Sequence, residues 1–155
     1  MCGSRPVRSA RVGNWSVKPH RAYALTSEED LAAVRIEGSN PVLAVHDLDG
    51  SADWYCRVLG CKRSDPDPGN WVFCRAGAVT FMLGRCPDVP QASSLGDHSY
   101  VAYLVVDSVD DFYANALAEN AEVLKPPTDE PWGRRELALR SPDGHRFMLG
   151  QQLLL

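Results

Sequence analysis

The chain has 155 residues, of which 45% are hydrophobic and 23% are charged. This composition predicts one soluble globular domain, or two half-size modules that share a core. No stretch approaches the roughly 18 consecutive apolar residues that a membrane-spanning helix requires, so a membrane protein is not expected. The formal net charge is −4, and the acidic excess outside the first 27 residues argues against nucleic acid and against an anionic membrane as partners.

Charge is unevenly distributed along the chain. Residues 1–27 contain five basic residues and no acidic one, which gives them +5 and leaves −9 on residues 28–155. A basic N-terminal segment without acidic residues predicts either a transit peptide or a poorly ordered tail. Residues 1–27 also lack the apolar segment of a secretory signal. We therefore expect residues 1–38 to be a basic extension, ordered only at a short helix near 27–35, where Ser27 precedes three acidic residues. The acidic body is compatible with a cationic small molecule.

The cysteines are five in number, an odd count, and include no CxxC pair. This pattern argues against structural zinc and predicts reduced thiols in a cytoplasmic protein. The cysteines are Cys2, Cys56, Cys61, Cys74 and Cys86.

The first half of the body predicts a strand, a helix and a hairpin. The helix should begin at Asp47 or Asp49, whose carboxylates can cap it, and end at Gly60. Its apolar stripe consists of Trp54, Tyr55, Val58 and Leu59. The other predicted segments are a strand at 41–45, a loop at 64–70, hairpin strands at 71–75 and 79–84, and a loop at 86–98.

The second half predicts the same order of elements. A helix should begin at Asp107 or Ser108 and run to about Glu119. The residues of Ser141-Pro142-Asp143-Gly144 are those that a type I turn favours. The other predicted segments are strands at 100–106 and 122–124, a proline-rich loop at 125–131, and strands at 135–140 and 145–150.

Two repeated patterns indicate an internal duplication. The tetrapeptide FMLG occurs at 81–84 and again at 147–150, and a Tyr-x-x-x-Leu pattern occurs in both predicted helices. The sequence therefore predicts an α+β fold made of two β-α-β-β-β modules, at about 39–97 and 98–153. Because one such sheet cannot cover itself, two modules must pack together or pair with another chain.

Strand alternation assigns the residues of each FMLG repeat to the two faces of a sheet. Phe81 and Leu83 should share the face packed under a helix, which leaves Met82 on the opposite, cleft-lining face. The same alternation places Phe147 in the core and Met148 on the cleft-lining face.

The duplication, together with the run PWGRRELALRSPDGHRF at 131–147, resembles the vicinal oxygen chelate superfamily. This family includes glyoxalase I, extradiol dioxygenases and bleomycin-resistance proteins, and the run is most similar to the bleomycin-binding branch. The resemblance covers about residues 40–152. It implies a curled sheet in each module with a ligand cleft.

The resemblance also implies where related enzymes hold a metal ion. Those positions fall here on Asn40, Met82, Val101 and Met148. An amide, two thioethers and an alkyl group are poor ligands for zinc, iron, manganese or nickel, so we expect no metal and no other cofactor. Each of the four histidines (His20, His46, His98 and His145) is interpreted as a surface or turn residue.

Aromatic and soft side chains are expected to line the cleft instead. The resemblance implies that Trp71 and Trp132 sandwich a flat part of the ligand, with Phe73 on the same strand face as Trp71. Glu136 is either a cleft acid that selects a charged group or a member of a buried ion pair with a neighbouring arginine. The expected ligand-binding residues are Trp71, Phe73, Met82, Tyr103, Trp132, Glu136 and Met148.

The function predicted from these features is metal-free binding and sequestration of a planar small molecule that could carry a positive charge. Family resemblance adds the expectation of a homodimer with shared clefts, often after exchange of a terminal strand. One alternative is a metal-dependent lyase, isomerase or dioxygenase of the same superfamily. Another is a regulatory or interaction module with a vestigial cleft.

Overall fold

The computed structural model describes residues 38–96 and 100–153 of the chain. The described residues belong to one compact unit of the chain, separate from residues 1–37. The basic segment at 1–37 with its predicted helix near 27–35, and the residues Cys2, His20 and His98, lie outside the described residues.

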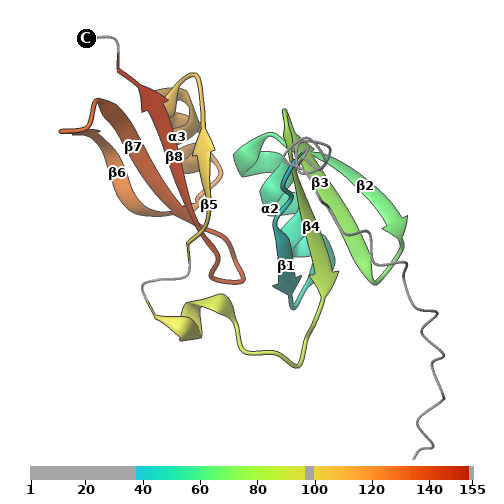
Figure 1. The fold of residues 1–155 in the computed structure, drawn as a ribbon. Helices are drawn as coiled ribbons and strands as arrows, with labels where there is room; N and C mark the ends of the chain where they lie inside the picture. The colour runs from blue at the N-terminus through green and yellow to red at the C-terminus, as the bar shows by residue number, and fades with distance from the viewer. Residues whose placement is uncertain (1–37, 97–99, 154–155) are drawn as a thin grey trace, which may run out of the picture. The chain divides into compact units, whose positions relative to one another are not determined.

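Residues 38–96, hereafter module 1, form a four-stranded sheet with one helix packed on it (Figure 1). The strand order is β1-β4-β3-β2, with β1 parallel to β4 and the other pairs antiparallel. The 86–98 segment was predicted as loop throughout, but it contains a short 3-10 helix. The elements are β1 (Val42–Val45), α2 (Leu48–Leu59), β2 (Lys62–Asp67), β3 (Trp71–Ala76), β4 (Val79–Arg85) and η1 (Ala92–Leu95).

Residues 100–153, hereafter module 2, repeat this arrangement with the strand order β5-β8-β7-β6. The predicted α+β fold of two β-α-β-β-β modules is therefore confirmed. None of the helices in the described ranges is long and apolar enough to cross a membrane. The elements are β5 (Tyr100–Val105), α3 (Val109–Ala118), β6 (Glu122–Glu130), β7 (Arg134–Arg140) and β8 (Arg146–Gln152).

The helix ends follow the predicted capping residues. The Asp47 side chain accepts a hydrogen bond from the Gly50 amide at the start of α2, and Gly60 ends that helix in the left-handed conformation. Ser108 caps α3 in the same way, through a hydrogen bond from the Asp111 amide. Both predicted helices are confirmed, because each carries its start signal in its own sequence.

The two predicted proline-rich loops are wrong, because most of each segment is strand. Residues 62–67 form β2, and residues 122–130 form one long β6. Both are edge strands, where one row of backbone amides lacks a partner, so proline is tolerated there. The register also shifts where the prolines occur, between Ser64 and Asp67 and between Lys125 and Thr128.

One aromatic core joins the modules. The rings of Phe81 and Phe147 meet edge to face with centroids 5.6 Å apart, and both side chains are fully buried. The Tyr55 ring contacts both, at 5.2 Å and 5.7 Å. The Trp54 ring stacks on Phe147 at 6.0 Å. The apolar stripe predicted for the first helix therefore packs against residues of both sheets, and Trp54 belongs to the core.

A polar contact joins the modules beside this core. The Ser141–Gly144 turn closes with a 2.9 Å hydrogen bond from the Gly144 amide to the Ser141 carbonyl, as predicted for a type I turn. Its Asp143 carboxylate is buried and accepts hydrogen bonds from the His46 amide at 2.9 Å and from the Ser51 hydroxyl. Asp143 thus connects the β7–β8 turn of module 2 with the start of α2 in module 1.

The imidazole of His145 lies next to this turn, and from its burial we expect the folded protein to lose stability in acid. Burial lowers the pKa of His145, and the nearby Asp143 carboxylate only partly opposes the effect. The unfolded chain, with an ordinary histidine pKa of about 6.5, takes up a proton first. The stabilising contribution is therefore complete above that pH and is lost as the pH falls toward the folded-state pKa.

We expect the free energy of urea unfolding to fall more steeply in the wild type than in His145→Asn as the pH drops below about 6.5. Equal slopes in the two proteins would show that His145 is not the group responsible.

Candidate functional site

Six of the seven predicted ligand-binding residues lie on the sheet faces that the helices do not cover, hereafter the open faces, and Trp132 lies in the turn between β6 and β7. In module 1, Met82 pairs with Phe73 and Trp71 pairs with Gly84 across adjacent strands. In module 2, Met148 lies between Tyr103 and Ala138, and Glu136 lies opposite Gly150. The predicted alternation is confirmed, because Phe81, Leu83, Phe147 and Leu149 are fully buried in the core while both methionines are only partly buried.

The glycine of each FMLG repeat makes room for an aromatic ring on the open face. A Cβ atom at Gly84 would lie 2.9 Å from the indole of Trp71. A Cβ atom at Gly150 would overlap the phenol of Tyr103. The repeat therefore has a physical explanation: two apolar residues for the core, one methionine for the open face, and a glycine beneath a ring.

The two open faces point away from each other. Phe81 and Phe147 meet in the shared core, and the residue after each of them projects from the opposite side of its strand. Trp71 lies on the face of module 1, and Trp132 lies beside the face of module 2, between β6 and β7. The two tryptophans therefore do not face each other within one chain.

On the open face of module 2, three donors converge on the Glu136 carboxylate. The Tyr103 hydroxyl donates to Oε1 at 3.0 Å, and the Trp132 Nε1–H donates to the same oxygen at 3.1 Å. The Lys125 ammonium donates to Oε2 at 3.3 Å and also pairs with Glu130. Of the two interpretations of Glu136, the ion pair is present, but its cation is Lys125 from β6 and not the arginine that was expected.

The Glu136 carboxylate stays ionised in this setting. Its side chain is only 6% exposed. Burial alone would raise the pKa of Glu136, but the hydrogen bonds from Trp132, Tyr103 and Lys125 outweigh burial and hold the pKa below its ordinary value. Burial and the hydrogen bond to Glu136 both raise the pKa of the Tyr103 phenol, so this group stays protonated and remains a donor.

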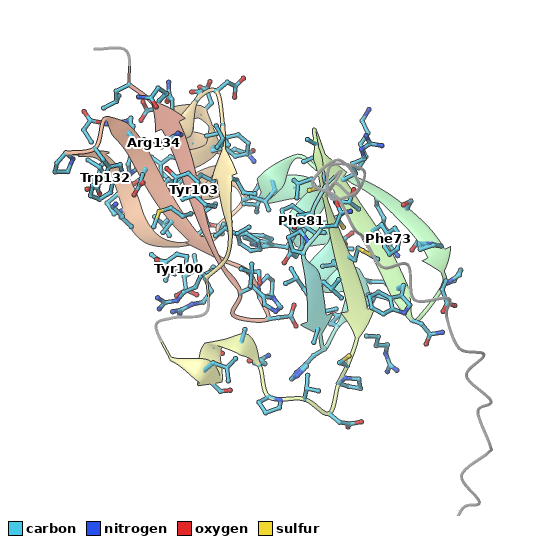
Figure 2. The ribbon with its side chains drawn as sticks, in the orientation of Figure 1. Phe73, Phe81, Tyr100, Tyr103, Trp132 and Arg134 are labelled. Carbon is cyan, nitrogen blue, oxygen red and sulfur yellow. The ribbon has the colours of Figure 1, made fainter. Side chains whose placement is uncertain are left out.

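Beside this carboxylate is a shallow hollow with aromatic walls. Its volume is about 360 Å³, and its lining residues are Tyr100, Val101, Ala102, Tyr103, Glu136 and Met148. Figure 2 shows Tyr100, Tyr103, Trp132 and Arg134 on module 2, while Phe73 lies on the sheet of module 1. Trp132 is 62% exposed and Tyr103 is 45% exposed, so both rings can meet a ligand.

A larger apolar groove of about 730 Å³ lies along β5. Its lining includes residues just before β1, the β3–β4 turn and β5, and Tyr103 is the one predicted ligand-binding residue in it. Tyr103 and Val101 belong to the linings of both hollows, so β5 separates the groove from the open face of module 2.

The four residues at the positions where related enzymes hold a metal do not form one cluster in this structure. The Asn40 Oδ1 accepts a hydrogen bond from the Thr80 amide at 3.1 Å. Val101 lines the smaller hollow, and Met82 and Met148 lie on opposite open faces. Within the described ranges, no group of three His, Cys, Asp or Glu side chains is arranged to hold a metal ion.

Sequence reasoning missed three residues of module 2. Lys125 lies beside two prolines in a segment predicted as loop, so the local sequence does not indicate that it belongs to a strand. Tyr100 precedes a register shift in β5, where alternation no longer predicts the face. Arg134, whose guanidinium lies 5.9 Å from the centroid of the Tyr103 ring, could have been found from its position two residues before Glu136 on the same strand face.

Comparisons with known proteins agree with this fold. The sequence matches the family model of the Glyoxalase/Bleomycin resistance protein/Dioxygenase superfamily over residues 38–149. An uncharacterised protein of Mycobacterium tuberculosis is 29% identical over 147 residues, which cover 86% of this chain and 85% of the relative.

Two solved structures have the same fold. TioX from Micromonospora sp. ML1 has a TM-score of 0.61 and 25% identity, covering 76% of this chain and 100% of TioX. The bleomycin resistance determinant encoded on transposon Tn5 has a TM-score of 0.63 and 22% identity, covering 77% of this chain and 100% of its own. From the family match and the paired β-α-β-β-β modules it follows that the chain belongs to the Glyoxalase/Bleomycin resistance protein/Dioxygenase superfamily.

Proposed function

We propose that this protein is a cytoplasmic binding protein of the bleomycin-resistance type. It sequesters a planar small molecule by stacking and leaves that molecule chemically unchanged. The observation that carries the proposal is the exposed indole of Trp132, fixed by a hydrogen bond at the edge of an aromatic open face. Phe73 and Trp71 give module 1 a second aromatic face.

Metal-dependent catalysis of the kind found in this superfamily does not fit the residues present. Asn40, Met82, Val101 and Met148 provide no charge to balance a divalent cation and no imidazole or carboxylate to bind one. Asn40 also uses its side-chain oxygen to bind the Thr80 amide.

The proposed site is completed by a second copy of the chain. Because the open faces point away from each other, a ligand can lie between Trp71 of one protomer and Trp132 of its partner only in a dimer. Each stacked aromatic pair adds about 0.5–1.5 kcal/mol of favourable binding free energy beyond that of burial, and a ligand cation over an indole adds about 0.5–2 kcal/mol. Micromolar affinity corresponds to about 8 kcal/mol, so two tryptophans supply a substantial share of it.

Titration of the purified protein with proflavine, a planar cationic acridine, tests the proposal. We expect a Kd in the micromolar range or below, with quenching of tryptophan fluorescence. Trp132→Ala and Trp71→Ala should each weaken binding about tenfold, which corresponds to about 1.4 kcal/mol. Leu117→Ala, an exposed change on α3, is the control and should leave the Kd unchanged.

Three results would contradict the proposal. If both tryptophan variants bind as the wild type does, stacking is not the source of affinity. About one transition metal per chain, in protein purified without chelators, would favour the enzymatic alternative. No stabilisation by proflavine or by any member of a broad thermal-shift screen would favour an interaction module.

A further inference from the structure

Glu136 has little capacity left to bind a ligand. Oε1 already accepts hydrogen bonds from Tyr103 and Trp132, and Oε2 accepts one from Lys125. The residue is only 5% exposed, so a ligand cation would have to displace one of these donors in order to reach the carboxylate. A buried carboxylate with three donors is satisfied by the protein itself.

The charge of Glu136 is also balanced inside the protein. Lys125 lies within ion-pair distance of both Glu136 and Glu130. The Arg134 guanidinium lies 5.9 Å from the centroid of the Tyr103 ring, so a second basic group is adjacent. These four charged side chains comprise two acids and two bases, and the face offers no excess negative charge to attract a cation.

The carboxylate instead determines the orientation of two aromatic rings. Trp132 lies in the turn between β6 and β7, and an indole that is 62% exposed has few packing contacts to select one rotamer. The hydrogen bond from its Nε1–H to an ionised carboxylate is of the stronger, charge-assisted kind. The phenol of Tyr103 is held by the same oxygen, above Gly150.

We propose that Glu136 is a positioning residue, which fixes the Trp132 indole and the Tyr103 phenol for stacking and does not act as the counter-ion of a cationic ligand. The ligand is then recognised by the flat shape of its ring system. Glu136 contributes equally to the affinity for neutral and for cationic planar molecules. This inference rests on the proposed binding function, but its first test needs no ligand.

The first test observes the indole N–H of Trp132 by ¹H–¹⁵N NMR, with the signal assigned from Trp132→Phe. In the wild type we expect this proton to exchange slowly with water although the ring is exposed. Glu136→Ala should accelerate the exchange at least tenfold, because the acceptor is gone. Glu136→Gln should keep the exchange slow, because its amide oxygen still accepts from the indole. Unchanged exchange in Glu136→Ala would overturn the proposal.

The second test compares two planar probes of similar size, cationic proflavine and neutral acridone. Glu136→Ala should weaken both about tenfold, as loss of the oriented indole predicts. Glu136→Gln should change both by less than about twofold, which corresponds to about 0.4 kcal/mol. A counter-ion role predicts the opposite, with Glu136→Gln weakening proflavine selectively, and that result would overturn the inference.

The two tests separate the inference from the proposed function. If neither probe binds the wild type, the binding function fails, while the indole exchange rates still show whether Glu136 orients Trp132. If Glu136→Ala does not fold, Glu136→Gln decides: fast indole exchange in that variant would contradict positioning, and slow exchange would support it.

Discussion

Replacing Phe147 with alanine is expected to lower the free energy of unfolding by about 3–5 kcal/mol. The Phe147 ring is fully buried and contacts the rings of Trp54, Tyr55 and Phe81, all of which belong to module 1. Truncation would leave a cavity between two sheets, where neither can collapse into it without moving the other. The loss would therefore include a cavity contribution beyond the transfer of the ring from water.

Urea denaturation followed by circular dichroism measures this loss. Phe73→Ala is the matched control, because it makes the same change on the half-buried open face of β3 and should cost only about 1 kcal/mol. A loss below about 2 kcal/mol for Phe147→Ala would mean that the sheets can close over the missing ring. Since Phe147 joins the modules, the two modules of the wild type and of Phe73→Ala should unfold in one transition.

Those parts of the fold whose signals lie within a few residues could be predicted from the sequence. Asp47 and Ser108 mark helix starts because a cap acts on an amide only three residues ahead. Phe81, Met82 and Leu83 were assigned to the correct faces because strand alternation is a property of the backbone. The duplication then extended this assignment to the second FMLG repeat.

What could not be predicted depends on neighbours far along the chain. Pro66 and Pro126 read as loop residues, but each lies in a strand at the edge of a sheet, and only the tertiary structure decides which strand is the edge. Lys125 pairs with Glu136 through the β6–β7 register, which no local pattern specifies. That the open faces point in opposite directions follows from the contact of Phe81 with Phe147.

Replacing Asp143 with alanine is expected to lower the free energy of unfolding by about 2–4 kcal/mol, because each buried donor left without an acceptor costs about 1–3 kcal/mol. Its carboxylate accepts from the His46 amide and the Ser51 hydroxyl of module 1. Both Asp143 and Ser51 are nearly inaccessible to water, which therefore cannot readily replace the lost acceptor.

Two further variants separate the hydrogen bonds of Asp143 from its charge. In Asp143→Asn the side-chain oxygen can still accept from the His46 amide, and the Ser51 hydroxyl can turn to accept from the new amide. The free energy of unfolding of this variant should therefore fall by less than about 1 kcal/mol. Ser51→Ala should lose equally little, because it removes a donor and leaves the carboxylate bound to the His46 amide. If Asp143→Asn is as unstable as Asp143→Ala in urea, the negative charge is what holds the turn against module 1, and the hydrogen-bond explanation is wrong. If all three variants unfold as the wild type does, the aromatic core alone joins the two modules.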